Sequence, residues 1–372
     1  MKKLLNAGIV AVLFLCCFAS QTNAQLTSAP SGGNKRASVS EQIALTDVTI
    51  HYNRPHVNKR EGHIWGELIP VGYVNLGFGS AKSSPWRAGA NENTTIEFST
   101  DVTIEGQPLA AGKYGFSIAY DPNECTLIFS KNTTSWGAFY YNPAEDVLRV
   151  KVKPVPTDKS VEWLKYEFAD QTSNSAVIQL QWEKLIIPFK VTVDEVGNQI
   201  ASFRRELRGE KGFAWEGWDQ AAAYCAQHKT NLDEALLWTD TATSVNFGGS
   251  QSFTAWSTRA EVLDSLGRAT DADAAMKKAL PYASLNELYF YGKSLAHHKK
   301  SKEAFDVFKL DYDKYPDQFL TNAGMARGYS ALGDYKKALT YAQKARAQAP
   351  DKPNQDILDS IIAKLQAGKD IN

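Results

Sequence analysis

The sequence has few cysteines, only three methionines and no excess of charge of either sign. Lys and Arg together number 41, and so do Asp and Glu. A balanced chain has no net field that would hold nucleic acid or an anionic membrane surface. We therefore expect no nucleic-acid partner.

Cysteine is too scarce for a disulfide framework. Of the four cysteines, Cys16 and Cys17 lie in the N-terminal segment, which leaves Cys125 and Cys225. Neither belongs to a Cys-x-x-Cys motif or to a cluster of Cys and His with metal-ligand spacing. We expect two free, buried thiols and no metal.

The common catalytic motifs are also missing. The sequence contains no Gly-x-Ser-x-Gly elbow, no His-Glu-x-x-His pair and no glycine-rich phosphate loop between a strand and a helix. No reaction or cofactor is indicated, and the sequence favours a protein that is not an enzyme.

The N-terminus has the pattern of a secretory signal. Lys2 and Lys3 precede an apolar run over residues 4–19, and Ala24 is a small residue at the expected cut. We predict a signal peptide over 1–24, a mobile leader over 25–36 and an exported protein, periplasmic or extracellular, without a transmembrane span. Lipid attachment at Cys16 or Cys17 is the weaker alternative, because bulky Phe14 and Leu15 precede them.

Residues 37–194 alternate apolar and polar side chains in short segments separated by turn signals. In the segment 148–152, for example, Leu148, Val150 and Val152 alternate with Arg149 and Lys151. Many short strands without intervening helices predict an antiparallel β-sandwich of roughly ten strands.

From residue 195 the pattern becomes helical. Gly292, Ala304 and Pro316 recur 34 residues later as Ala326, Ala338 and Pro350. Such a period predicts helical hairpins in which small residues let helices pack closely. We expect an α-helical repeat solenoid over 195–372, with four hairpins and a closing helix over 356–365.

These hairpins resemble tetratricopeptide repeats, most closely at 332–335, Leu-Gly-Asp-Tyr, with Ala338 and Pro350. The resemblance implies that the first helix of each hairpin lines a groove for a protein or peptide partner. Carried over by position, the groove residues are Asn286, Tyr289, Lys293 and His297 in the third unit and Leu320, Ala323, Arg327 and Ser330 in the fourth. Lys293 and Arg327 would together grip a carboxylate; the alternative is that they are solvated surface charges.

Three segments of the N-terminal half form a further pattern: Tyr-x-Arg-Pro at 52–55, Trp-Arg-Ala-Gly-Ala-Asn at 86–91 and Trp-Gly-Ala-Phe at 136–139. With these segments the N-terminal half resembles a family of secreted bacterial proteins known as domain of unknown function 2911. The resemblance spans residues 37–193 and implies no activity.

A long stretch rich in glycine and proline, residues 53–93, interrupts the strand pattern and is where we expect a site. The candidate ligand site comprises Arg54, Trp86, Arg87, Asn91 and Glu92. Arg54, Arg87 and Glu92 could form a ligand pocket, an internal ion-pair lattice or, as a third hypothesis, the site of an unrecognised enzyme.

Two further interpretations of this stretch stay open. His51, His56 and His63 permit a metal on paper, but their spacing matches no zinc pattern. Trp65 and Trp86 could stack on a sugar, which makes a carbohydrate-binding or carbohydrate-active sandwich, with the repeats as a docking module, the alternative function. Our main hypothesis is a binding or scaffold protein that uses its helical repeats.

Overall fold

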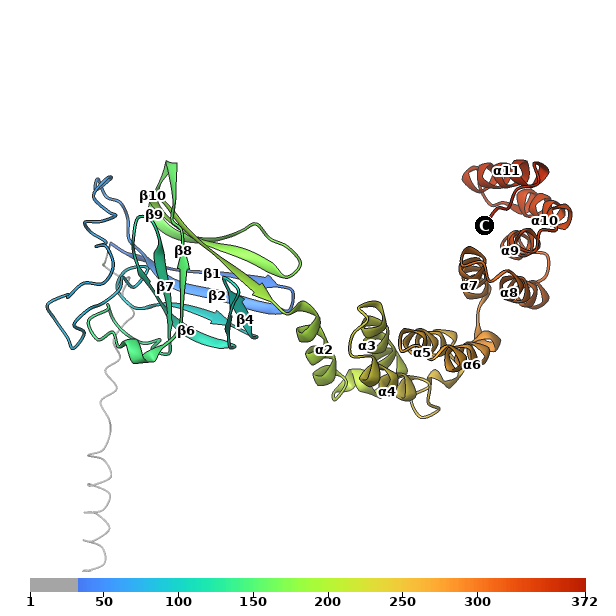
Figure 1. Cartoon of the computed structure of the whole chain (residues 1–372), viewed down its shortest axis with the longest axis horizontal. Coiled ribbons are helices and arrows are strands. Elements are labelled where there is room, and N and C mark those ends of the chain that lie inside the picture. The colour runs from blue at the N-terminus through green and yellow to red at the C-terminus, as the bar shows by residue number, and fades with distance from the viewer. Residues whose placement is uncertain (1–32) are drawn as a thin grey trace, which may run out of the picture. The chain divides into compact units, whose positions relative to one another are not determined.

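The structure, a computed structural model, describes residues 33–372 (Figure 1). The predicted signal peptide, most of the predicted leader, and Cys16 and Cys17 lie outside the described residues. The chain divides into two compact units with the boundary between Asp194 and Glu195.

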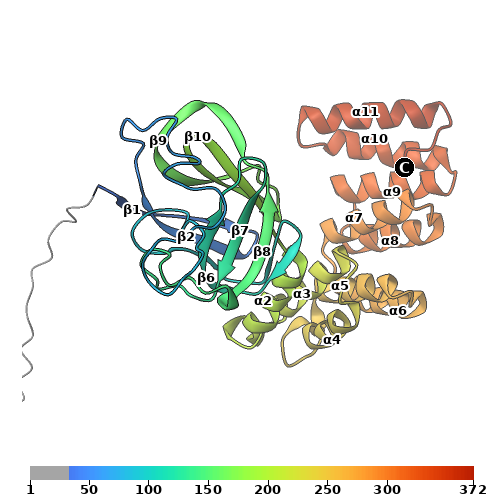
Figure 2. The same cartoon turned by 60° about the vertical axis from the view of Figure 1, so that its left-hand side comes forward.

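The first unit is built of two antiparallel sheets that face each other (Figure 2). One sheet has six strands in the order β1-β2-β3-β6-β7-β8, and the other has four in the order β5-β4-β10-β9. The strands are β1 (Lys35–Ile43), β2 (Thr46–Arg54), β3 (Thr94–Phe98), β4 (Val102–Ile104), β5 (Gln107–Leu109), β6 (Gly112–Ala119), β7 (Cys125–Ser130), β8 (Asp146–Val152), β9 (Val155–Ala169) and β10 (Ser175–Val193).

Apolar and polar side chains alternate along each strand, and the apolar ones form the core between the sheets. Ile50, Ile96 and Phe116 from the six-stranded sheet and Leu180 and Ile187 from the four-stranded sheet are fully buried in one cluster. Since side chains on a strand point alternately to its two faces, one face of each sheet becomes apolar. The predicted antiparallel β-sandwich is confirmed.

Strand β1 begins at Lys35, within the predicted leader over 25–36, because Lys35 and Arg36 pair with Arg54 and Asn53 of β2. Between β2 and β3, residues 55–93 form no strand of a sheet and are attached to the sandwich by isolated bridges.

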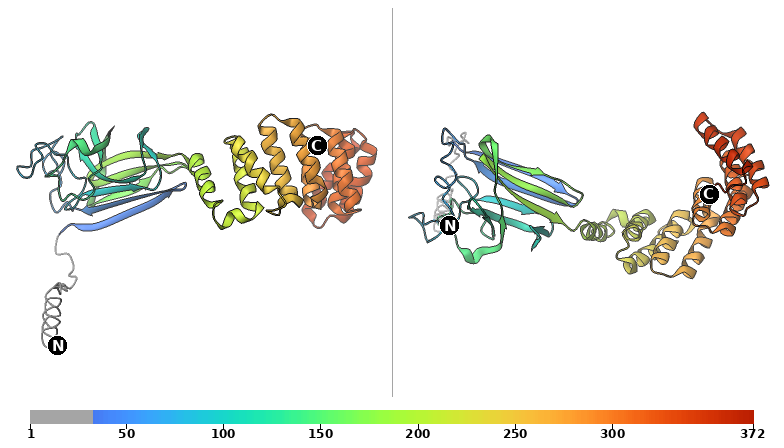
Figure 3. Two further views of the ribbon diagram at one scale, coloured as in Figure 1. Left: turned by 90° about the horizontal axis from the view of Figure 1, so that it is seen from below. Right: turned by 45° about the horizontal axis from the view of Figure 1, so that its top comes forward.

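The second unit contains ten α-helices within the described residues, stacked in chain order along a row (Figure 3). Helix α2 (Glu195–Glu206) precedes four hairpins and a closing helix. These are α3 (Trp215–Gln227) with α4 (Leu232–Ala242), α5 (Phe253–Ser265) with α6 (Ala269–Ala279), α7 (Leu285–His297) with α8 (Ser301–Lys314), α9 (Phe319–Ala331) with α10 (Tyr335–Gln348), and α11 (Lys352–Gln366).

The 34-residue period has a direct packing reason. A Cβ atom at Gly292 of α7 would lie 2.8 Å from the ring of Phe308 on α8. Ala304 and Ala338, one period apart, are both fully buried. Small side chains at these places allow the two helices of a hairpin to approach, and the predicted helical repeat is confirmed.

No helix within residues 33–372 is long and apolar enough to cross a bilayer.

Candidate binding sites

Residues 55–93 cover one part of the sandwich and create a cavity there. Two hydrogen bonds anchor this stretch to β6, from the Trp86 amide to the Ile118 carbonyl at 2.9 Å and from the Ile118 amide to the Trp86 carbonyl at 2.7 Å. A second contact joins the Gly72 amide to the Tyr120 carbonyl at 2.6 Å. These backbone bonds place the side chains next to Trp86 over the sheet.

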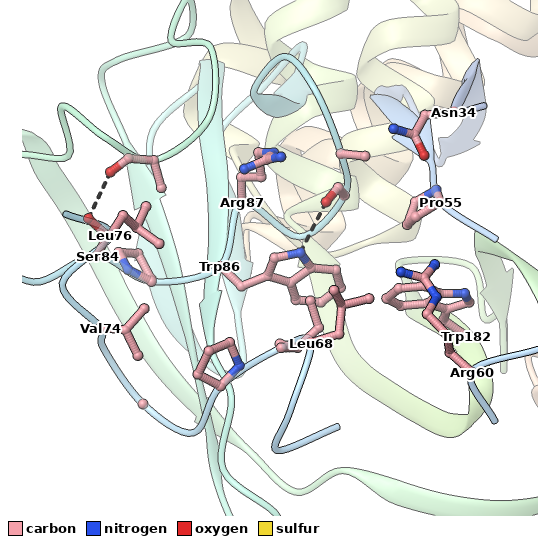
Figure 4. A pocket seen from close by; sticks show the side chains of 17 residues that line it. Asn34, Pro55, Arg60, Leu68, Val74, Leu76, Ser84, Trp86, Arg87 and Trp182 are labelled. Atoms are coloured by element: carbon pink, nitrogen blue, oxygen red, sulfur yellow. Dashed lines mark hydrogen bonds between the residues drawn. The ribbon is translucent and has the colours of Figure 1, made fainter. Parts of the chain in front are cut away.

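The cavity has a volume of about 290 Å³ (Figure 4). Its wall contains two arginines, Arg60 and Arg87, and no aspartate or glutamate among the described residues. Most of the remaining wall is apolar and includes Leu68, Trp86 and Trp182. The cavity therefore combines a positive charge with a hydrophobic surface.

Arg87 is one of the two predicted site residues that border the cavity, the other being Trp86. Its Nε atom is buried without a hydrogen-bond partner, and no ion pair to it occurs among residues 33–372. The guanidinium lies 6.0 Å from the ring centroid of Trp136. Burial lowers the pKa of Arg87, although an arginine stays protonated in proteins.

Trp86 forms part of the cavity wall from within an aromatic cluster. Its ring stacks on Trp182 with centroids 6.1 Å apart and meets Trp65 edge-on at 5.6 Å. Its indole N–H donates to the Gly89 carbonyl at 3.0 Å. The cluster fixes the orientation of the Trp86 ring beside the cavity.

Arg54 is not part of the cavity wall. Its Nε donates to the Leu164 carbonyl at 2.7 Å and its Nη2 to the Trp163 carbonyl at 3.5 Å. Arg54 thus joins the end of β2 to β9, which is a structural role.

Glu92 also has partners other than the two predicted arginines. It pairs with Arg36 at 3.1 Å and accepts a hydrogen bond from Asn53 at 2.8 Å. A hydrogen bond from its own backbone N–H, followed by the charge of Arg36 and the bond from Asn53, lowers the pKa of Glu92.

Asn91, with a left-handed φ of 55°, accepts a hydrogen bond from the Asn34 side chain at 3.0 Å.

The hypothesis that Arg54, Arg87 and Glu92 meet is therefore wrong in its geometry. No ion pair joins Glu92 to either arginine in the described part of the chain, and each of the three has a different environment. The hypothesis failed because the path of residues 55–93 separates them.

His56, His63 and Trp65 each contact different residues. His56 stacks on Trp163 at 4.7 Å, and His63 contacts Glu67 at 3.0 Å. No group of three possible metal ligands occurs within residues 33–372. Trp65 packs against the core beside Trp86 and Trp182, and the glycan hypothesis stays a prediction.

Sequence reasoning missed Arg60 and the cavity role of Trp182. Trp182 is 1% exposed and has the pattern of a core residue of β10, yet its ring borders the cavity. Arg60 donates to the carbonyls of Val57 at 3.0 Å and His56 at 2.7 Å. It lies in a run of turn residues, and no periodic signal would have singled it out.

The second candidate site lies on the first helices of the last two hairpins, α7 and α9. We define the α7–α9 face by Tyr289, Lys293, Arg327 and Ser330. The two helices pack against each other, and Arg327 Nε lies 3.4 Å from the Tyr289 hydroxyl. The other predicted groove residues on α7, Asn286 and His297, are exposed, as is Lys293.

Residues 370–372 of the chain lie on the α7–α9 face, and the end of the chain is marked beside α9 in Figure 1. Arg327 Nη1 donates to the Ile371 carbonyl at 3.1 Å, and the Asn372 side chain donates to the Arg327 carbonyl at 3.1 Å. Ser330 donates to the Asp370 carboxylate at 2.8 Å and accepts from the Ile371 amide at 3.1 Å.

The other contacts of the 370–372 segment are ionic and apolar. Lys299, between α7 and α8, lies 3.5 Å from the Asp370 carboxylate. The Ile371 side chain packs against the cluster that contains Ala326 and Ala338. The Asp370 carboxylate is thus held by Lys299 and Ser330. That Lys293 and Arg327 grip a carboxylate of a partner stays a prediction.

Comparisons with known proteins found solved structures similar to the helical unit and a family model that matches the sandwich unit. No curated protein matches. The helical region is similar to Pseudomonas aeruginosa pilF, with 18% identity over 43% of this chain and 70% of that chain and a TM-score of 0.31. It is also similar to YrrB, described as a TPR protein with an unusual peptide-binding site, with 15% identity over 45% of this chain and 84% of that chain and a TM-score of 0.30.

A third similar structure is a tetratricopeptide repeat protein from Parabacteroides merdae ATCC 43184. Its identity is 16% over 47% of this chain and 81% of that chain, with a TM-score of 0.24. For the sandwich, the match is to a family model over residues 34–191. These residues are therefore similar to the family described as protein of unknown function (DUF2911).

Proposed function

We propose that this chain is a non-enzymatic binding protein that holds an extended segment of a partner protein or peptide on its α7–α9 face. The observation that carries this proposal is the 370–372 segment, which occupies that face as a short peptide would. Residues of α9 form hydrogen bonds with both the backbone and the side chains of this segment.

The contacts define the chemistry of the segment that the face accepts. Lys299 and Ser330 receive a carboxylate, and the cluster around Ala326 receives the following apolar side chain. Arg327 binds a backbone carbonyl, which is independent of sequence. An acidic residue followed by an aliphatic residue in an extended chain fits these requirements.

Occupation by the chain itself has a thermodynamic consequence. A partner segment has to displace residues 370–372. The apparent association constant for the partner is therefore the intrinsic constant multiplied by the fraction of molecules in which the face is free. Removing the segment should therefore strengthen binding of a partner peptide without changing any residue of the face.

The test uses a fluorescein-labelled peptide with the sequence of residues 366–372, followed by fluorescence anisotropy. The peptide should bind the chain that lacks residues 370–372 at least about 10-fold more tightly than the intact chain. Arg327→Gln in the shortened chain should weaken binding by a similar factor.

Arg346→Gln is the matched control, because Arg346 is an arginine of α10 that pairs with Asp359 at 3.0 Å and does not contact the segment. It should leave the affinity unchanged. Equal peptide affinity of the shortened chain with and without the Arg327→Gln substitution would show that the face is not the peptide site.

We also propose that the protein is exported to the periplasm or the extracellular space. The charged and apolar pattern of residues 1–24 supports this. N-terminal sequencing of the protein from its cells should begin near Gln25, and retention of Met1 would contradict export by this route.

A further inference from the structure

The cavity of the sandwich has an unbalanced charge. Of its wall residues only Arg60 and Arg87 are ionised, within the part of the chain that the structure describes, and both are cationic. In Figure 4, Arg87 lies above the Trp86 ring and Arg60 to its right. The two guanidinium groups thus border the same space from different directions.

Neither arginine has a carboxylate partner among residues 33–372. Arg60 uses two of its N–H groups on the carbonyls of Val57 and His56. Arg87 makes no hydrogen bond in this part of the chain, and its Nε is buried. Other arginines of the sandwich are satisfied, as Arg36 and Arg149 show by their pairs with Glu92 and Asp146.

An arginine with a buried and unpaired N–H group is costly. Such a donor loses its bonds to water, and for a charged group this loss is unfavourable unless a partner replaces them. The Nε atom itself is too enclosed for a ligand to reach, but a carboxylate bound to the Nη groups of Arg87 would neutralise the charge. The guanidinium, which borders the cavity without a carboxylate partner among the described residues, therefore indicates an anionic ligand.

The apolar residues of the cavity wall indicate that the remainder of the ligand is hydrophobic. Leu68, Val74 and Leu76 contribute aliphatic surface, and Trp86 contributes a flat ring beside Arg87. Binding sites of this composition orient a hydrophobic ligand by a few polar contacts. A volume of about 290 Å³ restricts the ligand to a small molecule.

We propose that this cavity binds a small aromatic carboxylate, with the carboxylate on Arg87 and the ring against Trp86. Arg60, which borders the cavity from another direction, adds a second positive charge. The site belongs to the sandwich unit and does not depend on the function proposed for the helices.

The test is titration of the full chain with benzoate, followed by isothermal calorimetry and by the indole N–H signals of tryptophan in NMR spectra. Benzoate should bind and should shift the Trp86 indole signal. Arg87→Gln should weaken binding at least about 10-fold, because it removes the charge and the bidentate donor.

Arg36→Gln is the matched control, since Arg36 is an exposed arginine of the same unit outside the cavity wall. It should bind benzoate as the natural chain does. Thermal unfolding of each variant establishes that it is folded, and Arg60→Gln supplies a second variant, with a smaller loss expected, if Arg87→Gln does not fold.

Three outcomes would overturn the proposal. Benzoate at millimolar concentration that leaves the natural chain unchanged would exclude the site. Equal binding by folded Arg87→Gln would exclude the role of Arg87. Inorganic phosphate or benzyl alcohol bound as tightly as benzoate would show that the ring and the carboxylate are not recognised together.

Discussion

The guanidinium of Arg327 donates a 3.1 Å hydrogen bond to the backbone carbonyl of Ile371, 44 residues further along the chain. The bond brings residues 370–372 onto the first helix of the last hairpin. A surface that the repeat pattern predicts for a partner is in this way occupied by the chain itself.

Ser330→Ala should release the 370–372 segment. The hydroxyl donates to the Asp370 carboxylate and accepts from the Ile371 amide, so the substitution removes two bonds worth roughly 1 kcal/mol each. Hydrogen exchange of the Ile371 amide should become about 10-fold faster or more. Ser294→Ala, an exposed serine of α7, is the control and should leave this rate unchanged.

Asp311 should make the stability of the helical unit depend on pH. It is fully buried on α8 with both oxygens unbonded, and burial raises its pKa from 3.8 to about 7. Between these values the folded state binds a proton that the unfolded state has lost. The free energy of unfolding therefore falls as pH rises from about 4 to about 7, with a slope of up to about 1.4 kcal/mol per pH unit.

Asp311→Asn should remove most of this slope and should stabilise the chain above pH 7. Urea unfolding at about pH 4.5, 6 and 8 measures the effect. A smaller slope of the same sign should remain, because burial also raises the pKa of Asp219 on α3. An unchanged slope in the Asn variant would show that Asp311 is not its source.

Cys125 and Cys225 should be unreactive in the native protein. Both are free and buried, and burial raises the pKa of Cys125 to about 11 and that of Cys225 above its usual value. Because the thiolate is the reactive form, a chain without residues 1–24 should show almost no reaction with a disulfide reagent at about pH 8. After unfolding in urea, both thiols should react; the single Cys→Ser variants assign each of them.

Gly292→Ala should destabilise the third hairpin. The added Cβ would lie 2.8 Å from the Phe308 ring, and such overpacking typically costs about 1–3 kcal/mol. Urea unfolding measures the loss. The double variant with Phe308→Leu should lose less than the sum of the two single variants, and strict additivity would mean that the two residues do not clash.

The elements of both units could be predicted because each is encoded by nearby residues. In β8, burial of Leu148, Val150 and Val152 follows from a two-residue alternation. In the hairpins, the small residues Gly292 and Ala304 are matched 34 residues later by Ala326 and Ala338, and all four are buried. A local period is enough to specify which face of an element is buried.

The structure brings together only some of the residues predicted for the candidate ligand site. Trp86 and Arg87 border the cavity, whereas Arg54 and Glu92 do not. Arg54 bonds to Leu164, 110 residues away, and Glu92 pairs with Arg36, 56 residues away. The path of a long irregular stretch has no period that could reveal such pairs.

The sequence by itself determined the sandwich and the helical repeat, because burial and turn preferences act over a few residues. Only the tertiary structure decided that Arg87 lacks a partner among the described residues in a cavity with Arg60, and that residues 370–372 rest on Arg327 and Ser330. These relationships depend on contacts between residues far apart in the chain, and they form only when the whole fold brings those residues together.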